Sequence, residues 1–256
     1  MILRRLTDAF RKQDWFTVAV ETLIVVLGVF LGLQVNNWNA DRAARSAERS
    51  TLIRLHEDFE ESIAGQTRDI HFLEQQLVDQ ALILKSLDAC AVSPEDDMAF
   101  QRGIATLGWI NPPRLYRRTI DEITASGSTD IISNPKVAEE LARIIALVEW
   151  RATWFDRTIM AMDGYRQKVD PHIRYRMERT IDNPFVPNQR GGVDYNIDAL
   201  CKDERVANAI SAASFATYER LEAYRPILAA YESFLPLIAN ELHTRWDVEV
   251  SEPIAE

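Results

Sequence analysis

Glycine, histidine and cysteine are scarce in this sequence. The 256 residues include nine glycines, four histidines and two cysteines. So few glycines disfavour both a Gly-rich phosphate-binding loop and a fold of many short strands. The histidines His56, His71, His172 and His243 show neither i, i+4 pairing nor a nearby cysteine pattern, so the sequence predicts no metal site and no cofactor.

Positive charge is scarce outside the N-terminal segment. The formal net charge of the chain is -10. Residues 1–50 carry seven Lys and Arg against five Asp and Glu, a balance of +2, and the rest carries 22 against 34, a balance of -12. An acidic body repels phosphate backbones, and no basic stripe with interleaved aromatic residues occurs, so we expect no nucleic-acid partner.

Sequence patterns that carry catalysis are absent as well. Ser126-Gly127-Ser128 lacks the G-x-S-x-G pattern and a preceding strand, so a turn after a helix explains it better than a nucleophile does. Nothing else in the sequence matches a nucleophile and base, a metal site or a cofactor site. We therefore predict no catalytic residue and a protein that is not an enzyme.

One long hydrophobic run stands out against this polar background. Between residues 16 and 35 the only ionisable side chain is Glu21, and twenty helical residues extend about 30 Å, the thickness of the hydrocarbon core of a bilayer. A buried core helix would show a polar face, which Leu23 to Leu33 lacks. The run closes on an interfacial motif of polar and aromatic side chains, namely Gln34, Asn36, Asn37, Trp38 and Asn39.

These features predict the following division of the chain. Residues 1–15 form a short cytoplasmic tail, 16–36 a transmembrane helix, 37–250 an extracytoplasmic helical domain and 251–256 a flexible C-terminal tail. No small-residue cleavage site directly follows the hydrophobic run, so we expect the segment to stay attached to the mature protein. Basic residues flank both ends of the run, and their distribution leans slightly toward an N-terminus inside the cell.

Five residues fall on one face of the predicted transmembrane helix. They are Glu21, Val25, Gly28, Gly32 and Val35. Gly28 and Gly32 form G-x-x-x-G, which allows close helix-helix approach, although small residues are common in membrane helices anyway. An ionised Glu21 inside the hydrocarbon edge costs up to about 3 kcal/mol, so it either contacts a partner helix or lies where water reaches it.

The two cysteines lie in short polar breaks between helical stretches. Cys90 and Cys201 occur in "SLDACAVSPEDD" and "IDALCKDERV", where a disulfide is possible without distortion of a helix. The alternative is two unrelated reduced thiols. A disulfide would indicate an oxidising compartment and would place the start of the last helix beside the end of the first long one.

Beyond Trp38 the hydrophobic periodicity is helical almost throughout. A ladder with 4-3 spacing runs from Leu52 to Leu87 and predicts one long amphipathic, coiled-coil-like helix that continues out of the membrane. No alternating Val, Ile and Thr pattern and no Asn-Gly turn indicates a strand. The predicted fold class is all-α, an elongated antiparallel helical bundle.

Local start signals predict the remaining helices. Ser93-Pro94 opens a short helix, and Pro112-Pro113 opens another that ends at Gly127. Asn134-Pro135 opens a long helix whose apolar stripe includes Met162 and which Asp170-Pro171 either kinks or restarts. Residues 181–200 form the longest irregular stretch. Asp203 caps the last helix, which continues through Pro226 and Pro236. We expect Trp150 and Trp154, at i, i+4 spacing, to pack in the core rather than to form an exposed patch.

The hydrophobic run and the motif that follows it resemble the start of an uncharacterised family of bacterial single-span membrane proteins. That family has an N-terminal signature similar to E-I-x-L-V-V-x-G-I-x-I-A-L-Q-I-N-N-W-N. The residues that match are Glu21, Val25, Val26, Gly28, Leu33, Gln34, Asn36, Asn37, Trp38 and Asn39. A looser similarity to the family's S-G-x-x-x-x-I-x-N turn involves Ser126, Gly127, Ile132 and Asn134. The resemblance implies a bacterial inner-membrane protein and no catalytic residue, because the family has no established activity.

Two functions remain open at this point. The first is a non-enzymatic interaction or scaffold protein of the bacterial inner membrane, with its N-terminus cytoplasmic and its body periplasmic. Its partners would be the lipid bilayer and either further copies of the chain or another membrane protein. The alternative is an extracytoplasmic helical domain that senses a small molecule and acts through a membrane partner.

Overall fold

A computed structural model describes residues 15–127, 131–176 and 192–250. The chain divides into two units, Met1–Thr51 and Leu52–Glu256. The longest helix, α2 (Trp15–Ala89), has 75 residues and contributes to both units. The first unit consists, in its described part, of the N-terminal portion of this helix.

The N-terminal portion of α2 is apolar and uncovered. An 18-residue window of this helix has a mean hydropathy of 1.6, and none of its residues is buried. Large side chains such as Leu23, Val29 and Phe30 are more than half exposed. Within the described residues this is the one helix that is long and apolar enough to cross a membrane.

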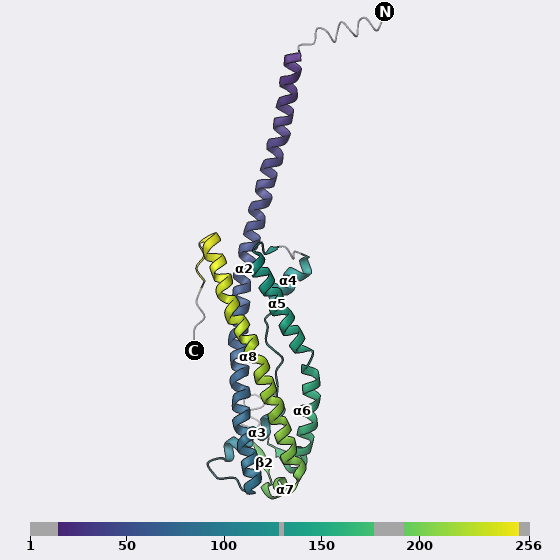
Figure 1. Cartoon of the computed structure of the whole chain (residues 1–256), viewed down its shortest axis with the longest axis vertical. Helices are drawn as coiled ribbons and strands as arrows, with labels where there is room; N and C mark the ends of the chain where they lie inside the picture. The colour runs from purple at the N-terminus through teal and green to yellow at the C-terminus, as the bar shows by residue number, and fades with distance from the viewer. Residues whose placement is uncertain (1–14, 128–130, 177–191, 251–256) are drawn as a thin grey trace, which may run out of the picture. The chain divides into compact units, whose positions relative to one another are not determined.

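The second unit is a helical bundle, which confirms the predicted all-α fold class (Figure 1). It contains the part of α2 from Leu52 onward, α5 (Pro135–Ala152), α6 (Phe155–Val169) and α8 (Glu204–Trp246). Helix α8 is antiparallel to α2, because Phe59 contacts Phe234 whereas Gln80 contacts Thr217. Helices α5 and α6 also pack against α8.

The core of the bundle has one large cluster of buried side chains near Phe59 and another near Phe100. The Phe59 ring is fully buried and lies edge-on to Phe234, at 4.7 Å between ring centroids, and to Tyr231, at 5.4 Å. Such contacts stabilise the pair beyond the area that they bury. The core therefore depends on aromatic packing between α2 and α8.

Two helix starts agree with the prediction because their capping signals are local. The side chain of Asn134 accepts a hydrogen bond from the backbone N–H of Lys136 at the start of α5, which has proline in its first turn. The side chain of Asp203 caps α8 in the same way through Arg205 N–H. Helix α8 continues through Pro226 and Pro236, also as predicted.

Two other predicted starts are wrong. Helix α3 (Asp97–Thr106) begins after Asp96, and Ser93 instead closes a turn in which its hydroxyl accepts from Asp96 N–H at 3.2 Å. Helix α4 (Arg118–Ser126) begins five residues after Pro113, and the prolines lie in irregular, non-helical chain between α3 and α4. Gly127 ends α4 in the left-handed conformation with φ 66°, as predicted.

The predicted helix from Pro135 to Met162 is interrupted at Thr153 and Trp154, between α5 and α6. Trp150 lies in α5 and Trp154 lies in the interruption itself, and the two residues are 54% and 51% exposed. The prediction that both tryptophans pack in the core is therefore wrong. Their rings instead stack with the guanidinium groups of Arg151 and Arg157 at 4.6 and 5.3 Å.

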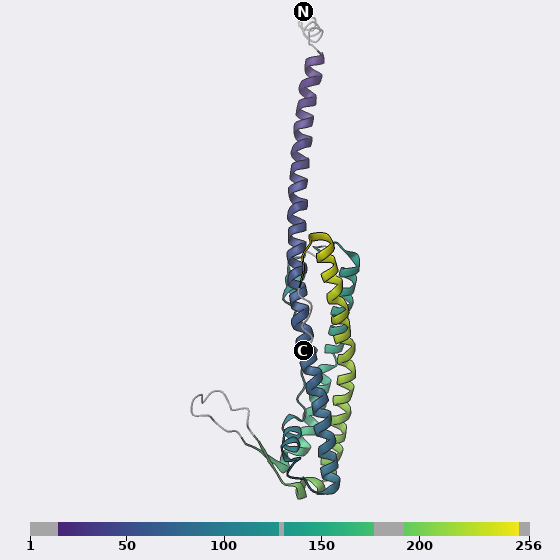
Figure 2. The same ribbon diagram turned by 90° about the vertical axis from the view of Figure 1, so that its left-hand side faces the viewer.

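A small hairpin also escaped prediction (Figure 2). After the 3-10 turn η2 (Asp170–His172), strand β1 (Ile173–Tyr175) pairs antiparallel with β2 (Val193–Tyr195), with Ile173 opposite Tyr195. Three residues are too few to show an alternating pattern. Helix α7 (Ile197–Lys202) follows, and residues 177–191 of the predicted irregular stretch lie outside the described residues.

Candidate functional site

The predicted packing face of the first unit is exposed along its whole length. Glu21, Val25, Gly28, Gly32 and Val35 recur at helical spacing in α2, so they share one face. A Cβ added at Gly28 or Gly32 would meet no atom within 4 Å. In this unit the glycines therefore leave an open strip of backbone on the helix surface.

The interfacial motif continues the same helix rather than forming a loop. Gln34, Asn36, Asn37, Trp38 and Asn39 all belong to α2 and are all exposed. The guanidinium carbon of Arg42 lies 5.8 Å from the centroid of the Trp38 ring, which is a cation–π contact one helical turn apart.

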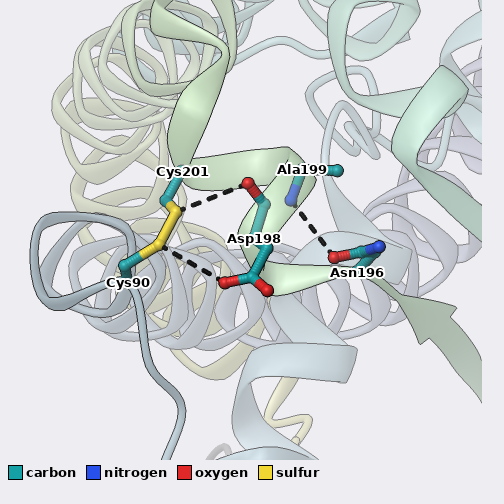
Figure 3. The surroundings of a disulfide bond; sticks show 5 residues. All are labelled: Cys90, Asn196, Asp198, Ala199 and Cys201. Atoms are coloured by element: carbon teal, nitrogen blue, oxygen red, sulfur yellow. Dashed lines mark hydrogen bonds between the residues drawn. A yellow bond between two sulfur atoms is a disulfide. The ribbon is translucent and has the colours of Figure 1, made fainter.

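Cys90 and Cys201 form a disulfide with their Cα atoms 5.5 Å apart (Figure 3). Cys90 follows α2 in the left-handed conformation, and the N–H groups of Cys90 and Ala91 bond to the carbonyls of Leu87 and Ser86. This pattern is a Schellman C-cap. Cys201 lies in α7, just before α8, so the disulfide joins the end of α2 to the start of α8.

The carboxylate of Asp198 lies beside this disulfide (Figure 3). Its Oδ1 atom is 4.0 Å from Cys90 Sγ, and its backbone carbonyl oxygen is 3.7 Å from Cys201 Sγ. Two sulfurs and a carboxylate are suitable ligands for a soft metal only when the sulfurs are thiolates. Because the sulfurs are bonded to each other, this group is a covalent cross-link in the present structure.

A second buried face of α2 is polar, and its burial was not predicted from the sequence. This polar seam consists of Asp58, Ser62, Gln66, Asp69 and Gln76, all of which are buried. Spacings of three, four and seven residues place them on one side of the helix, next to the apolar ladder. That spacing shows in the sequence that the five side chains share a face, but it does not show that the face is buried.

The polar seam binds the backbone of residues 109–117, which we call the strap. Gln76 Nε2 donates to the carbonyl oxygens of Thr106 and Trp109 at 2.8 and 3.0 Å. Gln66 Oε1 accepts from Arg114 N–H at 3.0 Å. Side chains of α2 thus supply the hydrogen bonds that a helix or sheet would otherwise give this irregular segment.

The same arrangement continues to the start of α4. Ser62 Oγ accepts from Tyr116 N–H at 2.9 Å, and Asp58 Oδ2 accepts from Thr119 N–H at 2.8 Å. Helix α4 has no capping side chain of its own at Arg117. Asp58, sixty residues earlier in the chain, therefore caps α4 in place of a local residue.

Three buried carboxylates pair with arginines of this region. Arg102 bonds to Asp79 at 2.7 Å, Arg114 to Asp69 at 2.5 Å and Arg118 to Asp58 at 2.8 Å. Each guanidinium group is at least two-fifths exposed, whereas each carboxylate is nearly or fully buried. Arginine donors replace water at all three carboxylates, and Asp58 also accepts from a backbone N–H, so their charges remain compensated.

The charge of Asp58 is favoured by its hydrogen bonds. Burial raises the pKa of the Asp58 carboxyl, but the bonds from Thr119 N–H and from Arg118 outweigh burial, so that the pKa lies below its ordinary value. Asp58 is thus an ionised cap at neutral pH.

Two tyrosines of α8 bind the other side of the strap. Tyr231 Oη donates to the Arg114 carbonyl at 2.8 Å, and Tyr224 Oη donates to the Asn111 carbonyl. Burial raises the pKa of both tyrosines, so both hydroxyls stay protonated donors. The strap is thereby held between α2 and α8, and its residues 111–116 line a surface depression of 420 Å³.

A second depression, of 380 Å³, lies at the hairpin and includes His172 and Tyr195. His172 Nε2 is 3.1 Å from Asp203 Oδ2, and Arg205 contacts the same carboxylate at 2.7 Å. The Arg205 and His172 contacts hold the pKa of Asp203 well below its usual range. Asp203 both caps α8 and accepts these two side chains, which is a structural use of its charge.

Comparisons with known proteins give no further assignment. No family model, curated protein or solved structure matches this chain.

Proposed function

We propose that this protein is a membrane-anchored, non-enzymatic interaction or scaffold protein. The proposal rests chiefly on the apolar portion of α2, where none of the most hydrophobic 18-residue window is buried. A continuous exposed apolar surface of this length is stable in contact with lipid or with other apolar helices, and unstable in contact with water. The anchor therefore has the bilayer as its first partner.

The resemblance of the N-terminal run to single-span bacterial proteins supports a place in the inner membrane. The Cys90–Cys201 disulfide supports a periplasmic body, because disulfides persist in oxidising compartments. The slight bias of basic residues toward the N-terminal side supports a cytoplasmic N-terminus.

A helix-helix interface is the second part of the proposal. Gly28 and Gly32 leave a strip of backbone without side chains on the face that also carries Glu21. Lipid chains and apolar side chains are equally apolar, so helices associate in a bilayer through close packing and polar contacts. On this face Gly28 and Gly32 allow close packing and Glu21 allows a polar contact, and the partner would be a second copy of the chain or a helix of another membrane protein.

The test is the mass of the full-length chain, purified from its native membranes in a mild detergent. We expect a complex larger than one chain, and we expect the double variant Gly28→Ile, Gly32→Ile to lose it. A matched control, Val26→Leu with Phe30→Leu, changes the opposite face and should keep the complex. A wild-type chain that purifies alone and as a monomer would contradict the proposal.

A further inference from the structure

Arg220 is a buried cation to which the described part of the chain gives no carboxylate partner. Only 8% of this residue is exposed, and it lies in the middle of α8. Its Nη1 atom donates to Tyr224 Oη at 3.2 Å, and its Nε atom has no hydrogen-bond partner. Within the described residues no carboxylate lies within ion-pair distance of this guanidinium group, in a chain that is acidic overall.

The described carboxylate nearest in this network, Asp69, is already paired with another arginine. Arg114 and Asp69 also act on the Tyr224 hydroxyl, which bonds to Arg220. Both oxygens of Asp69 are engaged by Arg114, and one of them also accepts from Asn111. Among the side chains that the structure describes, the carboxylate that acts on Tyr224 is thus paired with Arg114, and Arg220 has no such partner.

Aromatic rings compensate for part of this charge. The Arg220 guanidinium carbon lies 5.1 Å from the Phe155 ring centroid and 5.8 Å from the Tyr224 ring centroid. Cation–π contacts act on the charge but give the in-plane N–H groups no acceptor. A buried Nε–H without an acceptor is unfavourable, so the region lacks a group that both accepts hydrogen bonds and carries negative charge.

The side-chain chemistry indicates which group would fit. A guanidinium presents paired N–H donors in one plane, which match the two oxygens of a carboxylate. The flanking rings of Phe155 and Tyr224 would suit an apolar body attached to that carboxylate. Tyr224 also connects Arg220 to Asn111, which lines the 420 Å³ depression at the strap.

We propose that Arg220 is the anion-binding residue of a site between α6, α8 and the strap, and that the site binds a small organic carboxylate with an apolar body. This inference goes beyond the scaffold function and does not depend on it. Such a site would give the helical unit the sensing role that the sequence left open. Ligand binding between bundle helices is common in such folds.

The test compares benzoate with benzamide, which has nearly the same shape and no charge. Both are added to the full-length chain in a non-ionic detergent at constant ionic strength, and thermal unfolding is followed by tryptophan fluorescence. We expect benzoate to raise the Tm in a saturable manner and benzamide to have no such effect. Equal effects of the two compounds, or none from either, would overturn the proposal.

Variants at Arg220 and at a neighbouring arginine then locate the effect. Arg220→Met should abolish the response to benzoate and should leave the Tm without ligand equal to or above that of the wild type. Arg225→Met, a change at an exposed arginine of the same helix, should keep the full response. If Arg220→Met does not fold, Arg220→Lys decides the question. A response that requires at least tenfold more benzoate supports the site, and an unchanged response refutes it.

Discussion

Asp58 offers the sharpest test of the polar seam, because one buried side chain caps a helix that lies sixty residues away in the sequence. Asp58→Ala removes the acceptor of Thr119 N–H, and a buried donor without a partner costs about 1–3 kcal/mol. Loss of the negative charge at the start of α4 adds about 0.3–1 kcal/mol. The Arg118 side chain is 68% exposed and returns to water, so the broken ion pair adds at most about 1 kcal/mol. We expect a total loss of about 2–4 kcal/mol.

Urea unfolding of the full-length chain in detergent measures this loss as a lower midpoint at an unchanged slope. Asp58→Asn keeps an acceptor without the charge, so we expect roughly half the effect of Asp58→Ala. Asp121→Ala is the matched control, since this carboxylate of α4 is 64% exposed and should change stability by no more than about 0.5 kcal/mol. If Asp58→Ala were as mild as the control, the proposed capping across the bundle would be wrong.

Three further outcomes follow from the same structure. Replacement of Cys90 and Cys201 by serine removes a disulfide between residues 111 positions apart and should lower the free energy of unfolding by up to about 4–5 kcal/mol. A wild-type Tm that does not change when reductant is added would contradict this prediction. Gly103→Ala places a Cβ 2.8 Å from the Ile83 side chain and should destabilise the fold by about 1–3 kcal/mol. The control is Gly164→Ala, whose added Cβ would meet no atom within 4 Å, and this variant should be neutral or more stable by up to about 1 kcal/mol. Because the pKa of Asp58 is lowered in the folded state, its contribution is complete above about pH 4 and is lost as the pH falls further. The wild type should therefore lose more stability on acidification below about pH 4 than Asp58→Asn does, and parallel pH profiles would argue against an ionised cap.

Local signals in the sequence predicted the helices that carry their own caps. Asn134 and Asp203 bond to backbone groups two residues later, so the information lies within one turn. The apolar ladder of α2 was predicted equally well, because one buried face of a helix gives apolar residues at a regular spacing of three and four in the sequence.

The strap could not be predicted in the same way. Pro112-Pro113 is compatible with a helix start, and the structure keeps the segment non-helical because its backbone bonds to Gln66 and Gln76. Those partners are distant in the sequence, and no short window contains both sides of the contact. Polar residues on an amphipathic helix are usually solvated, so the buried seam resembled an ordinary hydrophilic face.

The interruption between α5 and α6 had no local signal either. Neither glycine nor proline occurs near Thr153 and Trp154, and Val148 and Met162 on either side are buried as the continuous pattern predicted. Trp150 lies inside α5, two residues after the buried Val148 and therefore away from the buried stripe of that helix, whereas Trp154 lies where α5 has ended and α6 has not begun.

The central claim is that α2 anchors the chain in a lipid bilayer. Extraction of native membranes with alkaline carbonate tests it most directly, because carbonate releases peripheral proteins and leaves integral ones behind. We expect the full-length chain to stay in the membrane pellet and to enter solution only with detergent. Its appearance in the carbonate supernatant as a water-soluble protein would contradict a membrane anchor in α2.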